Sequence, residues 1–141
     1  MSIEIYGSRH RNGASVGIGI SMLEDAFTGL IDQHESAALM LRLQNSGGVL
    51  TPLFFKAENG QVRSFSVSRP VDDPRLYEAL FRVLLLEGVV LYAPGSPPIF
   101  GHPNSASHLP TNMTEALGAA NLVISASDLK NALFNKARSA A

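Results

Sequence analysis

The sequence contains no cysteine, which excludes disulfide bonds, thiolate catalysis and zinc sites built on sulfur. It also lacks any long run of one charge, since eleven basic and twelve acidic residues give a formal net charge of −1. A basic surface for nucleic acid is therefore not expected. The longest near-continuous apolar run, residues 83–93, is broken by Glu87 and is too short to span a membrane. The first residues show no basic-then-apolar signal pattern, so a cytoplasmic location is expected.

What is present is typical of one globular domain. The chain has 141 residues, of which 45% are hydrophobic and 16% charged. A domain of this length buries roughly 68–70% of the surface of its unfolded chain. We therefore expect residues 1–141 to form a single α+β domain, in which antiparallel hairpins or a β-meander pack against three or four helices. A Pro-, Gly- and Ser-rich loop is expected at residues 94–112.

Two Asn-Gly pairs predict tight hairpin turns, because both residues tolerate the positive φ angles that such turns need. Asn12-Gly13 separates two runs in which apolar and small or polar residues alternate. Asn59-Gly60 joins two segments rich in Val, Phe and Ser. The apolar positions of the first hairpin are Ile3, Ile5, Val16, Ile18 and Ile20.

The second hairpin is expected to pair residues 49–57 with residues 61–68. Pro52 indicates an edge or a bulge in the first of these strands, because it cannot donate a ladder hydrogen bond. Residues 37–44 alternate as a strand would, but they are also apolar on both faces of a helix. If they form a strand, this region is a three-stranded meander; both interpretations stay open.

A first helix is expected to begin at Ser21, which with Glu24 forms a capping-box pattern. His34 falls on the extension of the apolar stripe of this helix, which favours a half-buried structural histidine over a catalytic base. The stripe consists of Leu23, Phe27, Leu30, Ile31 and Ala38.

A second helix is predicted between Asp72 and Gly88. Asp73 can cap the first turn, and Pro74 suits the first helical position because its missing N–H would be unpaired there. Gly88 can adopt the left-handed conformation that ends a helix.

The second helix is apolar around most of its circumference. One row contains Leu76, Leu80, Val83 and Leu84, and a second row contains Tyr77, Phe81 and Leu85. A single core needs one row, so the second is expected to be covered by a partner. The candidate partner or dimer contacts are therefore Leu76, Tyr77, Leu80, Phe81, Leu84 and Leu85 here and Leu23, Phe27, Leu30 and Ile31 in the first helix. Which face is core and which is interface stays open.

Beyond this helix the sequence predicts three short strands and two more helices. Asn112 and Glu115 can cap a short helix, and Ser125 and Asp128 can open a C-terminal one. The strands are expected at residues 89–92, 99–100 and 122–124.

No motif in the chain predicts catalysis, a metal or a cofactor. His102 and His108 lie close to Ser105 in the proline-rich loop, but the histidines are six residues apart and no third ligand is identifiable. A serine nucleophile would also need an orienting carboxylate and an oxyanion hole. An ordinary surface loop is the expected outcome.

The segment IEIYGSRHRNGAS resembles the strand-to-helix phosphate loop of flavodoxin-like FMN reductases. That resemblance implies a small flavin-binding reductase in which Ser8, Arg9, Asn12 and Ser15 bind the flavin phosphate. The following ASVGIGIS alternates as a strand, however, where that family has a helix.

The segments DDPRLYEALFRVLL and PPIFGHPNS resemble the central helix, and the strand and turn after it, of type III secretion chaperones of the Tir-chaperone type. If residues 37–44 are a strand, the order of elements from Ser21 onward is similar as well: helix, three strands, helix, strand, brief strand, helix. The resemblance implies a homodimer, with the central helix at its interface, that binds an extended segment of a secreted effector. The first 20 residues have no counterpart in that family.

The sequence therefore favours a non-enzymatic protein-binding protein, with a chaperone acting as a homodimer as its named form. An immunity protein or phage-encoded inhibitor that blocks a toxin or an enzyme is the alternative. Neither a nucleic acid nor a membrane is expected as a partner.

Overall fold

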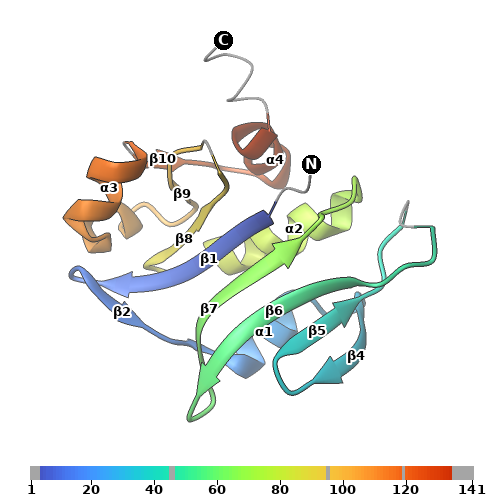
Figure 1. The fold of residues 1–141 in the computed structure, drawn as a ribbon. Helices are drawn as coiled ribbons and strands as arrows, with labels where there is room; N and C mark the ends of the chain where they lie inside the picture. The colour runs from blue at the N-terminus through green and yellow to red at the C-terminus, as the bar shows by residue number, and fades with distance from the viewer. Residues whose placement is uncertain (1–3, 45–46, 95, 119, 135–141) are drawn as a thin grey trace.

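The computed structural model describes residues 4–44, 47–94, 96–118 and 120–134. Within these residues the strands form one ten-stranded sheet whose main path runs β10-β9-β8-β1-β7-β6-β5-β4 (Figure 1). All its pairings are antiparallel except the one between β9 and β10. The strands are β1 (Glu4–Arg11), β2 (Ala14–Val16), β3 (Ile18–Gly19), β4 (Ile31–Glu35), β5 (Ala38–Leu41), β6 (Thr51–Glu58), β7 (Gln61–Ser68), β8 (Val89–Tyr92), β9 (Ile99–Phe100) and β10 (Asn121–Leu122).

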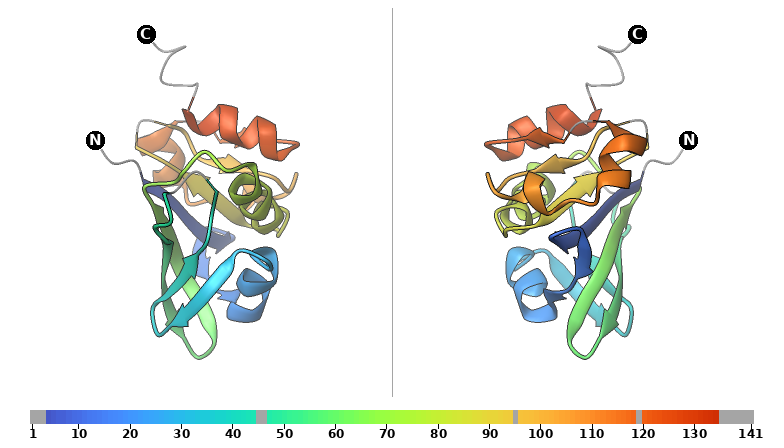
Figure 2. Two further views of the ribbon diagram at one scale, coloured as in Figure 1. Left: turned by 90° about the vertical axis from the view of Figure 1, so that its right-hand side faces the viewer. Right: turned by 90° about the vertical axis from the view of Figure 1, so that its left-hand side faces the viewer.

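Helices α1 and α2 cover one face of this sheet, and the core lies between them and the strands. Figure 2 shows α1 and α2 on one side of the sheet, with no helix over the other side of β6 and β7. Alternate residues of the strands, such as Ile5, Leu53 and Val67, face the helices and are fully buried. The helices are α1 (Ile20–Ala26), α2 (Pro74–Leu84), α3 (Thr111–Leu117) and α4 (Ala126–Phe134), with a 3-10 turn, η1 (Ser105–His108). The expected combination of strands and helices is confirmed.

Both Asn-Gly turns form as predicted. Asn12 and Gly13 have φ angles of 51° and 84°, and Asn59 and Gly60 have 52° and 75°. Within this hairpin only β2 pairs with β1, however, because β3 pairs with the first residues of β7. The first hairpin is therefore shorter than the alternation of its apolar residues suggested.

The first helix is shorter than predicted. It ends at Ala26, and Gly29 turns the chain with a φ of 88°, so Ile31 begins β4. The helix is preceded by Gly19 with no side-chain cap, so the prediction of Ser21 as cap is wrong. The sequence predicted one longer helix because the apolar residues Leu30 and Ile31, which lie after the end of α1, happen to continue its helical spacing.

His34 therefore lies on β4, where it is exposed and its Nε2 lies 3.1 Å from a carboxylate oxygen of Glu24. The prediction of a half-buried histidine is wrong, because it assumed that the helix continued. The ambiguous residues 37–44 contain strand β5, which pairs with β6 from Ala38 to Leu41. Strands β4 to β7 are thus consecutive antiparallel neighbours.

Helix α2 begins as predicted. The side chain of Asp73 accepts a hydrogen bond from the Arg75 N–H at 3.0 Å, and Pro74 is the first helical residue. The helix ends at Leu84, earlier than expected, and Gly88 has a φ of 89°. That glycine is required by space as well, since a Cβ there would lie 2.2 Å from the carbonyl oxygen of His10.

Pro52 lies in a strand that is paired on both sides, because β6 lies between β5 and β7. It is opposite Met40 of β5, while the register with β7 begins one residue later at Leu53. The proline thus precedes the ladder that would have needed its N–H. The register shift lies opposite Lys56 and Ala57 instead, where Arg63 of β7 is the extra residue.

The C-terminal third follows the prediction with small shifts. Strands β8 and β9 form where expected, whereas β10 ends at Leu122. Helix α3 begins at Thr111, so Asn112 lies inside it rather than at its cap. The Oγ of Ser125 accepts the Asp128 N–H at 3.0 Å and so caps α4. No helix in the described part of the chain is long and apolar enough to cross a membrane.

Candidate functional site

Most of the predicted contact residues lie in the core. Leu76, Leu80 and Leu84 of α2 are fully buried, as are Leu23 and Phe27 on the α1 side. Leu30 is 4% exposed and Ile31 is partly buried against the same core. Apart from Ile31, which begins β4 and is partly exposed, these side chains pack α1 and α2 onto the sheet and do not reach the surface.

The second row of α2 is covered only in part by the chain itself. Tyr77 is 3% exposed, because its ring packs edge-on against Phe134 of α4 with ring centroids 5.9 Å apart. Phe81 is half-buried, and Leu85 is 51% exposed. Helix α4 thus buries the Tyr77 end of the second row, whereas the Leu85 end is exposed to solvent.

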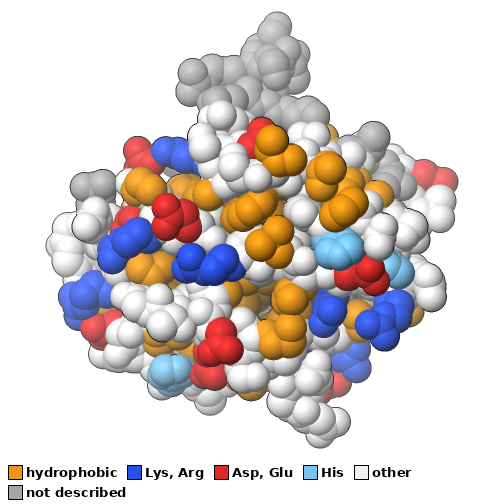
Figure 3. All heavy atoms as spheres, turned by 180° about the vertical axis from the view of Figure 1, so that it is seen from behind, with side chains coloured by type: hydrophobic (Ala, Val, Ile, Leu, Met, Phe, Trp, Pro, Cys, Tyr) orange, Lys and Arg blue, Asp and Glu red, His pale blue; other side chains and the backbone are white. Residues whose placement is uncertain are grey.

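The helical side of the molecule carries two pairs of exposed or half-exposed apolar residues, Phe81 and Leu85 on the second row of α2, and Met22 and Leu86 at the groove between α1 and α2. We call these four residues together the helix-face patch. Met22 is 41% exposed, and Phe81 and Leu86 are half-buried. A shallow groove of about 320 Å³ between α1 and α2 is lined by Met22, Val83 and Leu86, among others. Figure 3 shows hydrophobic side chains gathered at the centre of this side, with charged side chains around them.

The uncovered face of the sheet carries a second candidate site, built on a row of serines. Strand β7 turns Phe65 and Val67 inward, so Ser64, Ser66 and Ser68 point to the open side. Ser66 is the register partner of Tyr6 in β1 and of Phe54 in β6. Short side chains therefore form the floor of a groove that runs along β7 between larger side chains on its neighbours.

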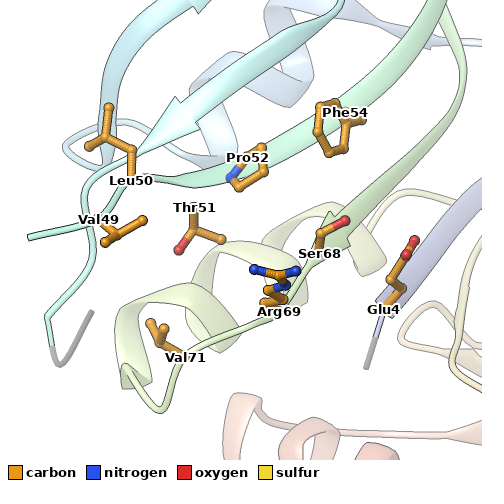
Figure 4. A pocket seen from close by; sticks show the side chains of 9 residues that line it. All are labelled: Glu4, Val49, Leu50, Thr51, Pro52, Phe54, Ser68, Arg69 and Val71. Carbon is orange, nitrogen blue, oxygen red and sulfur yellow. The ribbon is translucent and has the colours of Figure 1, made fainter. Parts of the chain in front are cut away.

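The walls of this groove are aromatic. The rings of Tyr6 and Tyr92 stack with their centroids 5.6 Å apart, and Phe54 on the opposite wall is 47% exposed. Two hollows of about 490 and 500 Å³ both include Phe54. The first contains Lys56 at one end of the groove, and the second contains Arg69 at the other (Figure 4).

Electrostatics distinguish the two ends. Lys56 and Arg69 are exposed, and neither forms an ion pair with any residue that the structure describes. Glu4 lines the hollow around Arg69 and is engaged by its neighbour, since hydrogen bonding to the Glu4 carboxylate raises the pKa of Tyr6. The Arg69 end thus combines one free cation with a partnered carboxylate.

A buried serine and a buried histidine lie together on strand β1. The Oγ of Ser8 is 2.9 Å from Nε2 of His10, and both residues are 8% exposed. Burial lowers the pKa of His10, and its Nδ1 has no hydrogen-bond partner among the described residues. A hydrolytic triad needs an orienting group at that nitrogen, so this pair does not form one.

The geometry implied by the flavin-reductase resemblance is not formed. Ser8 and Arg9 are part of strand β1, Asn12 is in the hairpin turn and Ser15 is in β2. The chain continues as strands β2 and β3 after the turn, so the turn does not lead directly into a helix N-terminus as a phosphate loop would. Arg9 instead donates from its Nε to the carbonyl of Glu87 at 3.0 Å.

The two loop histidines converge on Glu87. The Oε2 of Glu87 lies 3.2 Å from Nε2 of His108. Its Oε1 lies 3.9 Å from Nε2 of His102 and accepts a hydrogen bond from the side-chain Nδ2 of Asn104 at 3.3 Å. The Asn104 hydrogen bond is the main cause of the lowered pKa of Glu87, and His108 adds to it. No group of side chains in the described residues has the composition of a metal site. Glu87 therefore holds the proline-rich loop against the end of α2.

Neither the serine row nor the role of Glu87 was predicted from the sequence. The row had a visible signal, because Ser64, Ser66 and Ser68 alternate with Phe65 and Val67 on one strand. The role of Glu87 had no local signal, since its partners lie in a loop that folds back. No known family model matches this chain, and no curated protein or solved structure is significantly similar to it.

Proposed function

We propose that this protein acts by binding another protein, without catalysing a reaction, and that the helix-face patch is its contact surface. The observation that carries the proposal is the exposure of Leu85 at 51% and of Met22 at 41% beside half-buried Phe81 and Leu86. Single exposed apolar residues are ordinary on soluble proteins, but adjacent ones with a polar rim are typical of interaction sites.

A second copy of this chain is the proposed occupant of the patch. Asp25 and Arg82 line the same groove as Met22, so the patch carries charges of both signs at its edge. An isologous contact would bring such opposite charges together across a two-fold axis. Arg82 also donates to the Ala26 carbonyl at 3.0 Å, which holds α1 and α2 in one arrangement before any partner binds.

In its specific form, the proposal is a homodimeric chaperone of a secreted effector, acting in the cytoplasm. The order of elements is compatible with it in part, although four strands, β4 to β7, precede α2 where the resemblance implies three. Strand β1, for which that family has no counterpart, lies between β7 and β8. An immunity protein or phage-encoded inhibitor that blocks a toxin or enzyme remains the alternative form of a binding function.

Sedimentation velocity over a range of concentrations tests the contact surface. We expect a dimer for the wild-type chain and a monomer for Leu85→Asp, because a buried carboxylate without a partner opposes association. Val49→Asp is the matched control, since Val49 is 70% exposed but lines the hollow on the sheet side. A wild-type monomer at high concentration, or a dimer lost only in Val49→Asp, would contradict the proposal.

A pull-down from the native source with mass spectrometry separates the two forms of the proposal. A secreted effector as the specific partner supports the chaperone, and a toxin or an enzyme supports the inhibitor. Leu85→Asp serves as the comparison bait, because partner capture that survives in the monomeric variant uses another surface.

A further inference from the structure

Three residues with hydrogen-bond donors line the hollow at the Arg69 end of the groove. They are Thr51 and Ser68, with their hydroxyls, and Arg69, with its guanidinium, which Figure 4 shows between the other two. None of these side chains forms a hydrogen bond or an ion pair with any residue in the described part of the chain. Thr51 is 4% exposed, but its hydroxyl is not among the buried side-chain atoms that lack a hydrogen-bond partner in the described residues, so the hydroxyl is accessible from the hollow.

The backbone at Arg69 is unusual as well. Arg69 has a φ of 51°, in the left-handed region that favours glycine, and it directly precedes Pro70. A residue before proline prefers extended conformations, so this position is costly for a side chain with a Cβ. A glycine would relieve that cost, and the presence of arginine there is explained if its guanidinium has a use in the hollow.

The other walls are apolar. Val49, Pro52 and Phe54 line the hollow, with Val49 70% and Phe54 47% exposed. Its volume of about 500 Å³ is within the range of small-molecule sites. A ligand here would thus present an apolar body to these side chains and an acceptor to the three donors.

The charge of the hollow selects the acceptor. Arg69 supplies one positive charge, and Glu4, on the same lining, supplies one negative charge. Arg69 can neutralise one negative charge, so the second charge of a dianion such as a phosphate monoester would lie unpaired near Glu4. A carboxylate matches the planar fork of the guanidinium and can also accept from two hydroxyls.

We propose that this hollow binds a small monocarboxylate with an apolar body, with the carboxylate on Arg69, Thr51 and Ser68 and the body on Val49, Pro52 and Phe54. The site is on the opposite face from the helix-face patch and does not depend on the proposed protein-binding function. Its variants also differ from those of that patch, so each proposal can fail alone.

Titration of the isotope-labelled protein with hexanoate, followed by NMR, tests the site. We expect amide shifts at Val49, Thr51 and Phe54, and binding roughly tenfold or more tighter than that of hexanol, since hydrogen bonds to a charged group exceed neutral ones by that order. Hexanol has the same apolar body without the charge. Equal binding of the two probes, no shift with hexanoate, or shifts confined to the helix-face patch would each overturn the proposal.

Two variants assign the carboxylate to its donors. Arg69→Gln should reduce hexanoate affinity to that of hexanol. Arg63→Gln, on strand β7 but outside the hollow, should leave it unchanged. Thr51→Val should weaken hexanoate binding without loss of thermal stability, because it removes a hydroxyl that has no protein partner. Hexanoate binding that is unaffected by Arg69→Gln, or weakened equally by Arg63→Gln, would refute the assignment.

Discussion

The Oγ of Ser8 lies 2.9 Å from Nε2 of His10, two residues further along β1, and this is the one hydrogen bond that the buried imidazole makes through its ring to the described residues. A neutral imidazole needs one donor and one acceptor, whereas a protonated one needs two acceptors. Nδ1 of His10 has no acceptor within the described chain. Protonation of His10 would therefore leave a buried charged donor unpaired.

The stability of the protein should consequently fall in mild acid. Burial holds the pKa of His10 below its ordinary value of 6.5, so the unfolded state binds a proton first as the pH falls. The loss of unfolding free energy due to His10 should be absent above pH 6.5 and grow below it, with a slope of at most about 1.4 kcal/mol per pH unit. The free energy of unfolding, measured in urea at several pH values from about pH 8 to about pH 5, gives this slope.

His10→Gln should remove that part of the slope, and His34→Gln should not, because His34 is exposed on β4. An identical pH dependence in the wild type and in His10→Gln would contradict the assignment to His10.

Asp73 should be a strong single contributor to stability. Its side chain is fully buried and accepts from the Gln44 N–H at 2.7 Å, while the guanidinium of Arg75 holds its pKa at about 2, below the ordinary 3.8. The charge should contribute about 2 kcal/mol, present above the ordinary pKa and lost as the pH falls through the folded-state value. Asp73→Asn keeps a cap oxygen and should lose about that amount at neutral pH, and Asp73→Ala should lose more.

Chemical denaturation of the wild type and Asp73→Asn at several pH values checks this prediction. The difference between them should narrow toward pH 2. If it stays constant down to that pH, the contribution comes from packing or from the cap oxygen and not from the charge.

Gly7 should be intolerant of any side chain. A Cβ on Gly7 would lie 2.2 Å from Cζ of Phe65, whose ring lies over this position from the neighbouring strand. Gly7→Ala should lower the free energy of unfolding by about 1 to 3 kcal/mol through overpacking. In a Phe65→Leu background the same change should cost less, and a double-mutant cycle measures that coupling. Additive effects of the two substitutions would show that the ring moves away freely.

His108 should protect one amide of the β1–β2 turn selectively. Its Nδ1 accepts from the Asn12 N–H at 3.2 Å, whereas its backbone carbonyl accepts from the Gly13 N–H at 2.9 Å. His108→Ala should therefore raise the hydrogen-exchange rate of Asn12 by about fivefold, the equivalent of one ordinary hydrogen bond, and leave Gly13 nearly unchanged. Equal loss of protection at both amides would mean that the whole hairpin detaches.

Local features of the fold were predictable from the sequence, because each depends on residues close together in the chain. Both Asn-Gly turns and the Asp73 cap of α2 follow from backbone preferences and short hydrogen bonds. The end of α1 was not predictable from hydrophobic spacing, since Leu30 kept the helical stripe while Gly29 turned the chain. A pattern of apolar residues does not record a change of element between them.

The candidate sites depend on contacts between distant residues. The contact of Phe134 with Tyr77 decides how much of the second row of α2 is covered, and these residues lie in separate helices. The groove on the sheet needs the register that places Ser66 between Tyr6 and Phe54. Neither can be inferred from periodicity, which reports the faces of an element but not what lies against them.

The place of β1 in the sheet also bears on how the chain is assembled during translation. Tyr6 pairs with Ser66 on one side and with Tyr92 on the other. Strand β1, which is synthesised before the other described strands, therefore waits for both of its long-range neighbours. Strands β4 to β7 can pair with one another as they emerge, whereas β8 can join them only through β1. Until Tyr92 has been synthesised, the edge of β1 that later pairs with β8 is unpaired. In this nascent intermediate, the exposed edge of β1 is open to wrong strand pairing.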